Sequence, residues 1–159
     1  MPFECHLKLG SIKGESGSAK HKDEIELLSY SFGITNKVIP GSDRRVGQAS
    51  VSEMRCTKRP DKASSQIAYA SLSHEKMSSA IISCSKQTGG KPPEDYLTIT
   101  LTNVYVTSFE ISQGGSDDAG EESFTLDFGK IEWDYKMQGA DGVLTTAGSM
   151  TYDLGKASR

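Results

Sequence analysis

The sequence predicts a mainly β protein, a compact β-barrel of two packed antiparallel sheets with one flanking α-helix and an extended loop. Apolar residues alternate with polar ones at the two-residue period of half-buried strands. The alternating runs are rich in Val, Ile, Thr, Tyr and Phe, and segments containing Gly, Ser and Pro separate them. Only one segment has the three- and four-residue apolar spacing of a helix. Together these patterns favour a closed or doubly layered sheet.

Length and charge limit the classes of protein that fit. The 159 residues correspond to a single domain, residues 1–159, with 35% hydrophobic residues and a net charge of −3. The basic residues are scattered, which argues against nucleic-acid binding and against an anionic membrane surface. No window approaches 18 consecutive apolar residues, so we expect no insertion into a membrane. The N-terminal residues lack a basic segment followed by a long apolar run, so export would use a route that reads no N-terminal signal.

Three cysteines, Cys5, Cys56 and Cys84, lie far apart in the sequence. Their odd number and the lack of a CxxC pair indicate neither a disulfide framework nor a zinc site. We therefore expect three reduced thiols in a protein made in the cytosol.

The first strand is predicted over residues 3–9, where Phe, Cys and Leu alternate with Glu, His and Lys. A polar loop with Gly14 and Gly17 joins it to the next strand. That strand is the run LSYSFGIT, residues 28–35, which has one apolar face and one face of small uncharged polar residues. The apolar face, expected to pack into the barrel, comprises Leu28, Tyr30, Phe32 and Ile34.

Residues 36–48 contain Pro40, two glycines and several charges, so we interpret them as an excursion from the sheet. A strand follows over residues 49–58. Residues 62–73 have helical apolar spacing, and Asp61 after Pro60 is the predicted N-cap.

The second half of the chain has the strongest strand signals. Strands are predicted over residues 77–87, 96–112 and 123–137, and a short last strand over residues 149–154. In the third of these runs the apolar parity flips at Gly129 and Lys130, which predicts a β-bulge. Strands this long, with both faces covered, suggest that the sheet makes contacts outside the monomer.

Candidate catalytic and metal-binding groups are sparse. His21 lies in the polar run HKDE, which favours a mobile, solvated charge cluster over a metal site, and His6 is expected at the surface. No GxSxG motif or Cys–His pairing is present. The acidic loop with Asp117 and Asp118 lacks the ligand spacing of a calcium loop. Glu132 and Asp134 resemble a glycosidase pair only superficially. We therefore expect no enzyme, no metal and no cofactor.

Several segments resemble the Hcp family, the hemolysin-coregulated proteins of the bacterial type VI secretion system. The similar segments cover nearly the whole chain in order: residues 7–16, 21–33, 51–64, 94–112 and 122–135. The resemblance implies a barrel of two sheets with a flanking helix. It also implies that six copies close into a ring with a wide channel, and that rings stack into a tube.

The resemblance implies the partners as well. These are other copies of the chain in a homohexamer and in stacked rings, the sheath and spike protein of the apparatus, and small effector proteins held in the channel. The protein would be made in the bacterial cytoplasm and exported by the apparatus without a cleavable signal peptide.

Three sets of site residues combine the resemblance with the strand pattern. Uncharged polar residues expected to line the channel and bind effectors are Ser29, Ser31, Gly33 and Thr35; the alternative is that they face bulk water. The loop expected to contact the adjacent ring contains Val38, Ile39, Pro40, Asp43, Arg44 and Arg45, although this segment could instead be an ordinary hairpin tip. Residues expected at the subunit interface are Thr98, Thr100, Thr102, Val104 and Val106.

Two other classes of function remain open. A monomeric β-sandwich that binds sugar or protein ligands would have an aromatic-lined pocket, and a small hydrolase would have a cleft with coupled titratable groups.

Overall fold

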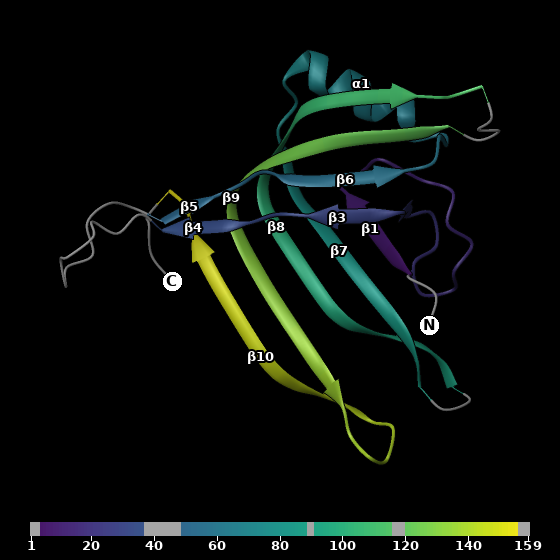
Figure 1. Cartoon of the computed structure of the whole chain (residues 1–159), viewed down its shortest axis with the longest axis vertical. Coiled ribbons are helices and arrows are strands. Elements are labelled where there is room, and N and C mark those ends of the chain that lie inside the picture. Colours follow the sequence, from purple (N-terminus) through teal and green to yellow (C-terminus); the bar gives the residue numbers. More distant parts are fainter. Residues whose placement is uncertain (1–3, 37–48, 89–90, 116–119, 156–159) are drawn as a thin grey trace.

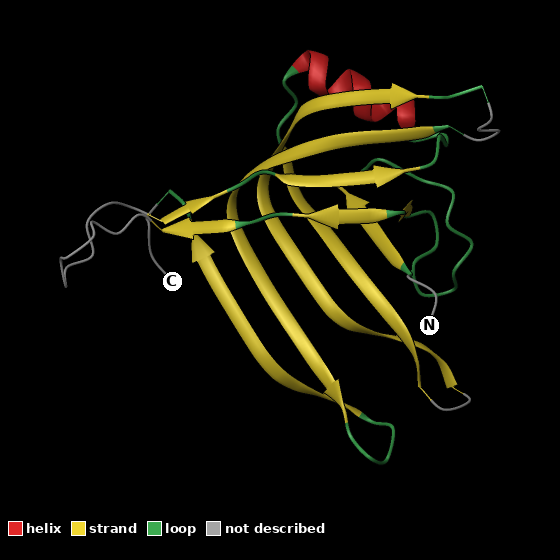
Figure 2. Ribbon diagram, viewed as in Figure 1, coloured by secondary structure: helices red, strands yellow, loops and turns green. Residues whose placement is uncertain are grey.

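The computed structural model describes residues 4–36, 49–88, 91–115 and 120–155. Strands dominate these residues, and a single helix lies at one end of them (Figures 1 and 2). The elements in chain order are β1 (Cys5–Leu9), β2 (Ile25–Leu27), β3 (Ser29–Ser31), β4 (Ile34–Asn36), β5 (Ala49–Val51), β6 (Met54–Lys58), α1 (Ser64–Ser73), β7 (Met77–Thr88), β8 (Lys91–Ser112), β9 (Glu121–Gln138) and β10 (Leu144–Asp153). The predicted mainly β fold with one flanking helix is confirmed.

The main sheet closes on itself as a barrel. Its strand order is β2-β1-β7-β8-β9-β6-β3, and β4 and β5 form a separate two-stranded sheet. The two ends of the order, β2 and β3, are consecutive in the chain and are separated only by Leu28. The backbone N–H of Leu28 donates to the carbonyl of Thr57 on β6 at 2.7 Å. The continuous segment from β2 to β3 therefore pairs with β1 at its start and with β6 at its end. This segment closes the sheet, because it bridges the edge formed by β1 and the edge formed by β6.

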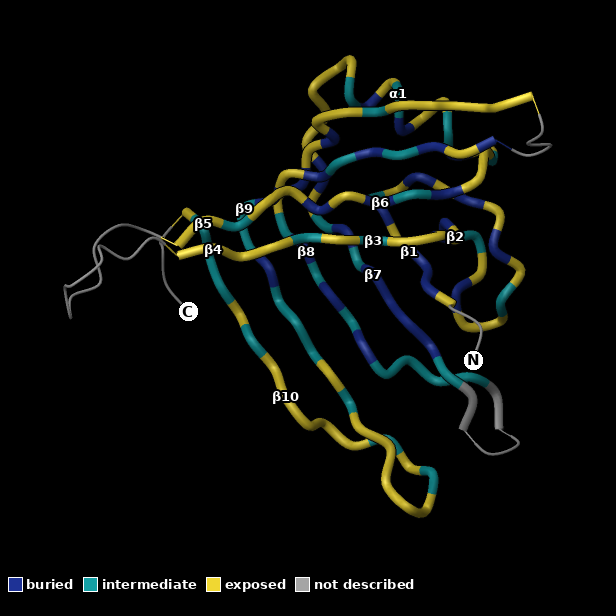
Figure 3. The backbone as a smooth tube through the Cα atoms, in the orientation of Figure 1, coloured by how far each residue is buried: buried dark blue, intermediate teal, exposed yellow. Residues whose placement is uncertain are grey.

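Beyond the barrel, the long strands continue as an open curled sheet (Figure 1). The first half of β9 pairs with β6, and its second half pairs with β10 along the same edge. The N-terminal half of β10 is largely exposed, whereas β7 is mostly buried (Figure 3). One end of the molecule is thus a closed barrel and the other is a half-barrel with an open concave face.

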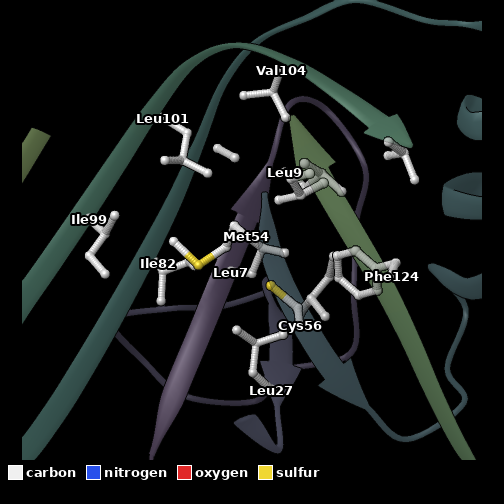
Figure 4. Close-up of a cluster of buried hydrophobic side chains, with 14 of the residues drawn as sticks. Leu7, Leu9, Leu27, Met54, Cys56, Ile82, Ile99, Leu101, Val104 and Phe124 are labelled. Carbon is white, nitrogen blue, oxygen red and sulfur yellow. The ribbon is translucent and has the colours of Figure 1, made fainter. Parts of the chain in front are cut away.

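The core fills the closed end of the barrel. Inward side chains from β1, β6, β7, β8 and β9 converge there (Figure 4), and the largest fully buried apolar ones include Leu7, Leu9, Met54, Ile82, Ile99, Leu101 and Phe124. Each such side chain stabilises the fold by about 1.5–3 kcal/mol relative to exposure. These positions alternate with less buried ones along each strand, as expected of strands with one face toward a core.

The apolar parity flips on β8 and β9 at the same level. Asn103 has a left-handed φ of 57° there, and it lies beside Gly129 of the neighbouring strand. The strand register is unchanged on either side, with Thr102 opposite Lys130 and Val104 opposite Phe128. The predicted bulge at Gly129 and Lys130 is therefore wrong, because no residue is inserted. Both strands turn over together, and the register shift of β8 against β9 lies further on, between Val106 and Ser108.

Two predicted long strands are each broken. Residues 28–35 divide into β3 and β4, and residues 49–58 divide into β5 and β6. At the break, Gly33 and Ser52 exchange hydrogen bonds: Gly33 N–H donates to Ser52 Oγ at 2.7 Å, and Ser52 N–H donates to the Gly33 carbonyl at 2.8 Å.

The break changes the expected apolar face of residues 28–35. Leu28 and Ile34 are 42% and 51% exposed, whereas Tyr30 and Phe32 pack partly against the core. The expectation that all four pack into the barrel is wrong for Leu28 and Ile34, because Leu28 lies at the junction of β2 and β3, where the strand is interrupted, and Ile34 lies in the separate sheet with β5.

The cysteine prediction is wrong for two of the three residues. Cys5 on β1 and Cys84 on β7 are directly opposite in the register and form a disulfide. Cys56 is a free thiol, and burial raises its pKa to about 12. A separation of 79 residues concealed the bridge, because only the pairing of β1 with β7 brings the two sulfurs together.

The helix is confirmed as α1, with a different start. Its N-cap is Ala63 rather than Asp61, while the Asp61 carboxylate accepts the Ala63 N–H at 2.9 Å just before the helix. His74 ends α1 in a left-handed conformation with φ 54°. Among the described residues, no helix is long and apolar enough to cross a membrane.

Candidate functional site

Paired strands extend the polar face of β3 across the barrel. Ser29 lies opposite Thr57 on β6, which in turn lies opposite Ser123 on β9. Side chains paired in this way project from the same face of a sheet. Two residues along the strands, a second row on the same face of the sheet consists of Ser31, Arg55 and Thr125, which are paired in the same way. These residues are named the hydroxyl face here, together with Ser108 of β8, which lies opposite Thr125.

The hydroxyl face points away from the core. Its rows alternate with Cys56 and Phe124, which are both 0% exposed inside the barrel. Its side chains bond to one another: Ser29 Oγ lies 2.5 Å from Thr57 Oγ1, and Thr125 Oγ1 lies 2.6 Å from Ser108 Oγ. Part of its hydrogen-bonding capacity remains available, since each hydroxyl both donates and accepts.

The hydroxyl face contains one charged side chain and has others beside it. Arg55 lies within the second row, and Glu110 lies opposite Ser123 on the β8 side. The Thr107 hydroxyl donates to the carboxylate of Glu53, which precedes β6. The uncharged character expected for residues 28–35 thus holds for that run of the chain, but neighbouring strands bring charges to the same surface.

The four residues predicted to line the channel do not all lie on one sheet. Ser29, Ser31, Gly33 and Thr35 are all exposed. The two serines belong to the hydroxyl face, Gly33 lies at the strand break, and Thr35 pairs with Ser50 in the separate two-stranded sheet. Sequence reasoning missed Thr57, Ser123 and Thr125. Their alternation with buried Cys56 and Phe124 was the available signal.

The predicted subunit-interface residues do not share one face. Thr98, Thr100 and Thr102 are half-buried, and they lie opposite Asp134, Glu132 and Lys130 of β9. Val104 and Val106, at 0% and 4% exposure, belong to the core of the chain itself. Including these two valines was wrong, because the backbone turns over at Asn103. The predicted loop residues Val38, Ile39, Pro40, Asp43, Arg44 and Arg45, and the acidic pair Asp117 and Asp118, lie outside the described residues.

His21 and His6 lie in buried surroundings, contrary to the solvated positions predicted for them. Both are 7% exposed. His21 Nδ1 lies 3.0 Å from Glu24 Oε1, and His21 Nε2 lies 2.8 Å from Asp95 Oδ1. The polar composition of the loop concealed this, because burial arises from its packing on β1.

The His21 cluster has no catalytic arrangement. Ser85 Oγ donates to Asp95 Oδ1 at 2.7 Å rather than to an imidazole nitrogen. Both ring nitrogens of His21 are bound to carboxylates, so neither remains to activate a nucleophile. Among the described residues, no group of three or more His, Cys, Asp or Glu side chains could hold a metal ion.

The open half-barrel carries an apolar hollow. Its volume is about 470 Å³, and its lining includes Leu97, Trp133, Tyr135 and Met150. Phe32 packs edge-on against Trp133 with ring centroids 5.7 Å apart, which places the hollow next to the strand break.

Comparisons with known proteins agree with this architecture. Residues 6–135 match the family model described as type VI secretion system effector, Hcp. Protein hcp1 of Pseudomonas aeruginosa strain PAO1 is 32% identical over 144 residues, covering 89% of this chain and 88% of that protein.

Solved structures are similar over almost the full length. A type six secretion system protein has a TM-score of 0.89 at 26% identity, with 99% of both chains covered. Hcp1 from Salmonella typhimurium has a TM-score of 0.79 at 27% identity, again with 99% of both chains covered. Because the family model spans most of the sequence, the chain belongs to the Hcp family of type VI secretion tube proteins.

Proposed function

We propose that the chain is the subunit of a type VI secretion tube, in which six copies close into a ring and rings stack around a channel that carries small effector proteins. The observation that carries the proposal is the similarity to Hcp proteins in both sequence and fold over nearly the whole chain. Its partners would be its own copies, the sheath and spike protein of the apparatus, and the effectors. The function is structural and transporting, without a catalytic step.

In this proposal the hydroxyl face lines the channel. A channel that accepts different proteins needs a wetted wall that forms weak hydrogen bonds and offers no large apolar patch. Ser29 and Ser31 are exposed, and Thr57 and Thr125 continue their rows. Gly33 and Thr35 would extend the wall beyond the barrel, towards the loop that we propose contacts the adjacent ring.

Ring closure needs two different surfaces on each subunit. We place one of them on the outward threonines of β8: Thr98, Thr100 and Thr102. The edge of β10 is a second candidate, since β10 pairs with β9 on one side and with no other strand of the described chain. An exposed strand edge of this kind favours pairing with another chain.

Native mass spectrometry tests the assembly. A species about six times the 17.2 kDa chain is expected, with annular particles in negatively stained electron micrographs. A folded protein that stays monomeric at the concentrations used for microscopy would contradict the proposal.

The apolar hollow favours a second candidate, a monomeric β-sandwich that binds sugar or protein ligands. Trp133 and Tyr135 contribute the aromatic lining that such a site needs. The native mass separates the two functions, because this candidate requires a single chain in solution that binds its ligand in the hollow.

A further inference from the structure

Residues 13–24, named the flap here, pack on the outward side of β1 at His6, against which the His21 ring stacks. The flap is held in shape by its own backbone: Gly14 N–H donates to the Asp23 carbonyl, and Asp23 N–H donates to the Ser16 carbonyl. Hollows of about 860 Å³ and about 300 Å³ border it. Two side chains of the flap reach other parts of the chain: the Glu15 carboxylate accepts the Lys62 N–H at 2.6 Å, and His21, which is 7% exposed, reaches β1 and β8.

His21 joins the flap to two strands. Its Nε2 lies 2.8 Å from Asp95 Oδ1 on β8, and its ring stacks on His6 of β1 with centroids 4.9 Å apart and planes 15° apart. Its Nδ1 lies 3.0 Å from Glu24 within the flap. Two carboxylates accept from the two ring nitrogens only if both nitrogens carry hydrogen, so this geometry requires a positively charged His21.

His6 has the opposite requirement. Its Nδ1 is buried and has no hydrogen-bond partner in the described part of the chain. A proton added to His6 would create a second cation stacked on His21 without an acceptor at this atom. The closed flap therefore requires a neutral His6 beside a charged His21.

We propose that His6 and His21 form a pH-sensitive latch, which holds the flap against β1 and β8 only while His6 is neutral and His21 is charged. The latch does not depend on the proposed ring or on its cargo. It follows from the stacked rings, the two carboxylates and the orphaned nitrogen.

The surrounding charges support opposite shifts of the two groups. Burial lowers the pKa of His6 and the charge of His21 lowers it further, against the raising effects of Glu24, Glu26 and Glu4. Burial also lowers the pKa of His21, but hydrogen bonds to Asp95 and Glu24 outweigh it and leave the pKa raised.

Asp95 is stabilised as a carboxylate. Burial raises the pKa of Asp95, but hydrogen bonds from Ser85 and His21 and the charge of Lys20 lower it below its usual value. The acceptor of the latch therefore stays ionised throughout the range in which the two histidines titrate.

A solvated imidazole has a pKa of about 6.5, which is the reference value for the open flap. Because the pKa of His21 is raised in the closed state, its contribution to the stability of the closed flap is complete below pH 6.5 and is lost as pH rises through the raised pKa. Because the pKa of His6 is lowered in the closed state, its contribution to the stability of the closed flap is complete above pH 6.5 and is lost as pH falls through the lowered pKa. Closure is therefore most stable between the two shifted values, and it weakens on both sides.

Hydrogen exchange of the full-length chain from about pH 5 to about pH 9 tests the latch. After correction for intrinsic exchange rates, a bell-shaped profile is expected for protection of the Lys62 amide, which donates to Glu15 of the flap, and of the Gly14, Ser16 and Asp23 amides, whose bonds within the flap lose the support of β1 when it detaches. Each linked proton changes the opening equilibrium by up to about tenfold per pH unit. A flat or one-sided profile would overturn the proposal.

Three variants separate the two limbs of the profile. H6F keeps a flat ring against His21 but cannot titrate, so the acid limb should disappear and the alkaline limb should remain. D95N keeps an acceptor for Ser85 but removes the charge, so protection should fall and the alkaline limb should move to lower pH. H74N is the control, since His74 is exposed at the end of α1, and its profile should match the parent.

A measurement on the unmodified chain covers the case in which a variant fails to fold. Nitrogen-15 shifts of the imidazole rings at neutral pH should show His21 doubly protonated and His6 neutral. A neutral His21, or an acid limb that persists in folded H6F, would contradict the latch.

Discussion

Lys58 and Glu122 form an ion pair inside the closed barrel, with Lys58 Nζ 2.7 Å from Glu122 Oε1. Their side chains are 0% and 1% exposed, although 64 residues separate them in the chain. Lys58 Nζ also donates to Asp61 at 2.8 Å and to Ser64 at 3.0 Å. The pair therefore ties β6 and β9 to the start of α1.

Removing the lysine leaves a buried carboxylate without its partner. K58M is expected to lower the free energy of unfolding by about 3–5 kcal/mol, measured by urea denaturation. The double variant K58M/E122L should recover part of this loss, because an apolar pair of similar volume needs no charge partner. In the half-exposed pair Lys130–Glu132, K130M should cost less than about 1 kcal/mol. Equal losses for K58M and K130M would contradict the structural role of the buried pair.

The Cys5–Cys84 disulfide should make stability depend on the redox state. Because 79 residues separate the two cysteines, its reduction is expected to lower the free energy of unfolding by about 4 kcal/mol. Denaturation with and without a dithiol reductant measures the difference. The double variant C5S/C84S is the control, since its midpoint should not respond to reductant. An identical midpoint for the oxidised and reduced parent would refute the contribution.

Gly14 and Gly17 form a matched pair within the flap. A Cβ on Gly14 would lie 2.5 Å from the Glu24 carbonyl oxygen, whereas a Cβ on Gly17 meets nothing within 4 Å. G14A should lower the free energy of unfolding by about 1–3 kcal/mol, because the clash is with backbone. G17A should stay within about 0.5 kcal/mol of the parent. Thermal unfolding compares the two, and a G17A loss as large as that of G14A would count against the described flap.

Two arginine substitutions distinguish the proposed channel wall from the proposed subunit interface. S31R should leave ring assembly intact and reduce co-purification of a bound effector by about tenfold, since it places a bulky charge on the hydroxyl face. T100R should instead prevent ring formation, because it places the charge between subunits. Native mass spectrometry reports assembly for both variants. Loss of rings in S31R would show that the face assignment is wrong.

Local patterns in the sequence were sufficient for the type of fold and for most of the core. Alternation predicted the half-buried first strand that carries Leu7, and apolar spacing located α1 to within two residues at its start. These features depend on neighbours along one strand or one helix turn. The polar face of Ser29 and Ser31 was visible for the same reason, although not the strands that extend it.

Contacts between distant segments were decided only in the folded chain. The Cys5–Cys84 bridge, the Lys58–Glu122 pair and the burial of His21 each join elements whose pairing no local pattern reports. The turn-over at Asn103 likewise depends on the neighbouring strand, and it moved Val104 and Val106 from the predicted interface into the core. The sequence alone determined which residues alternate, while the closure of the sheet determined which of them meet, because hydrogen-bonded register, and not spacing along the chain, brings side chains together.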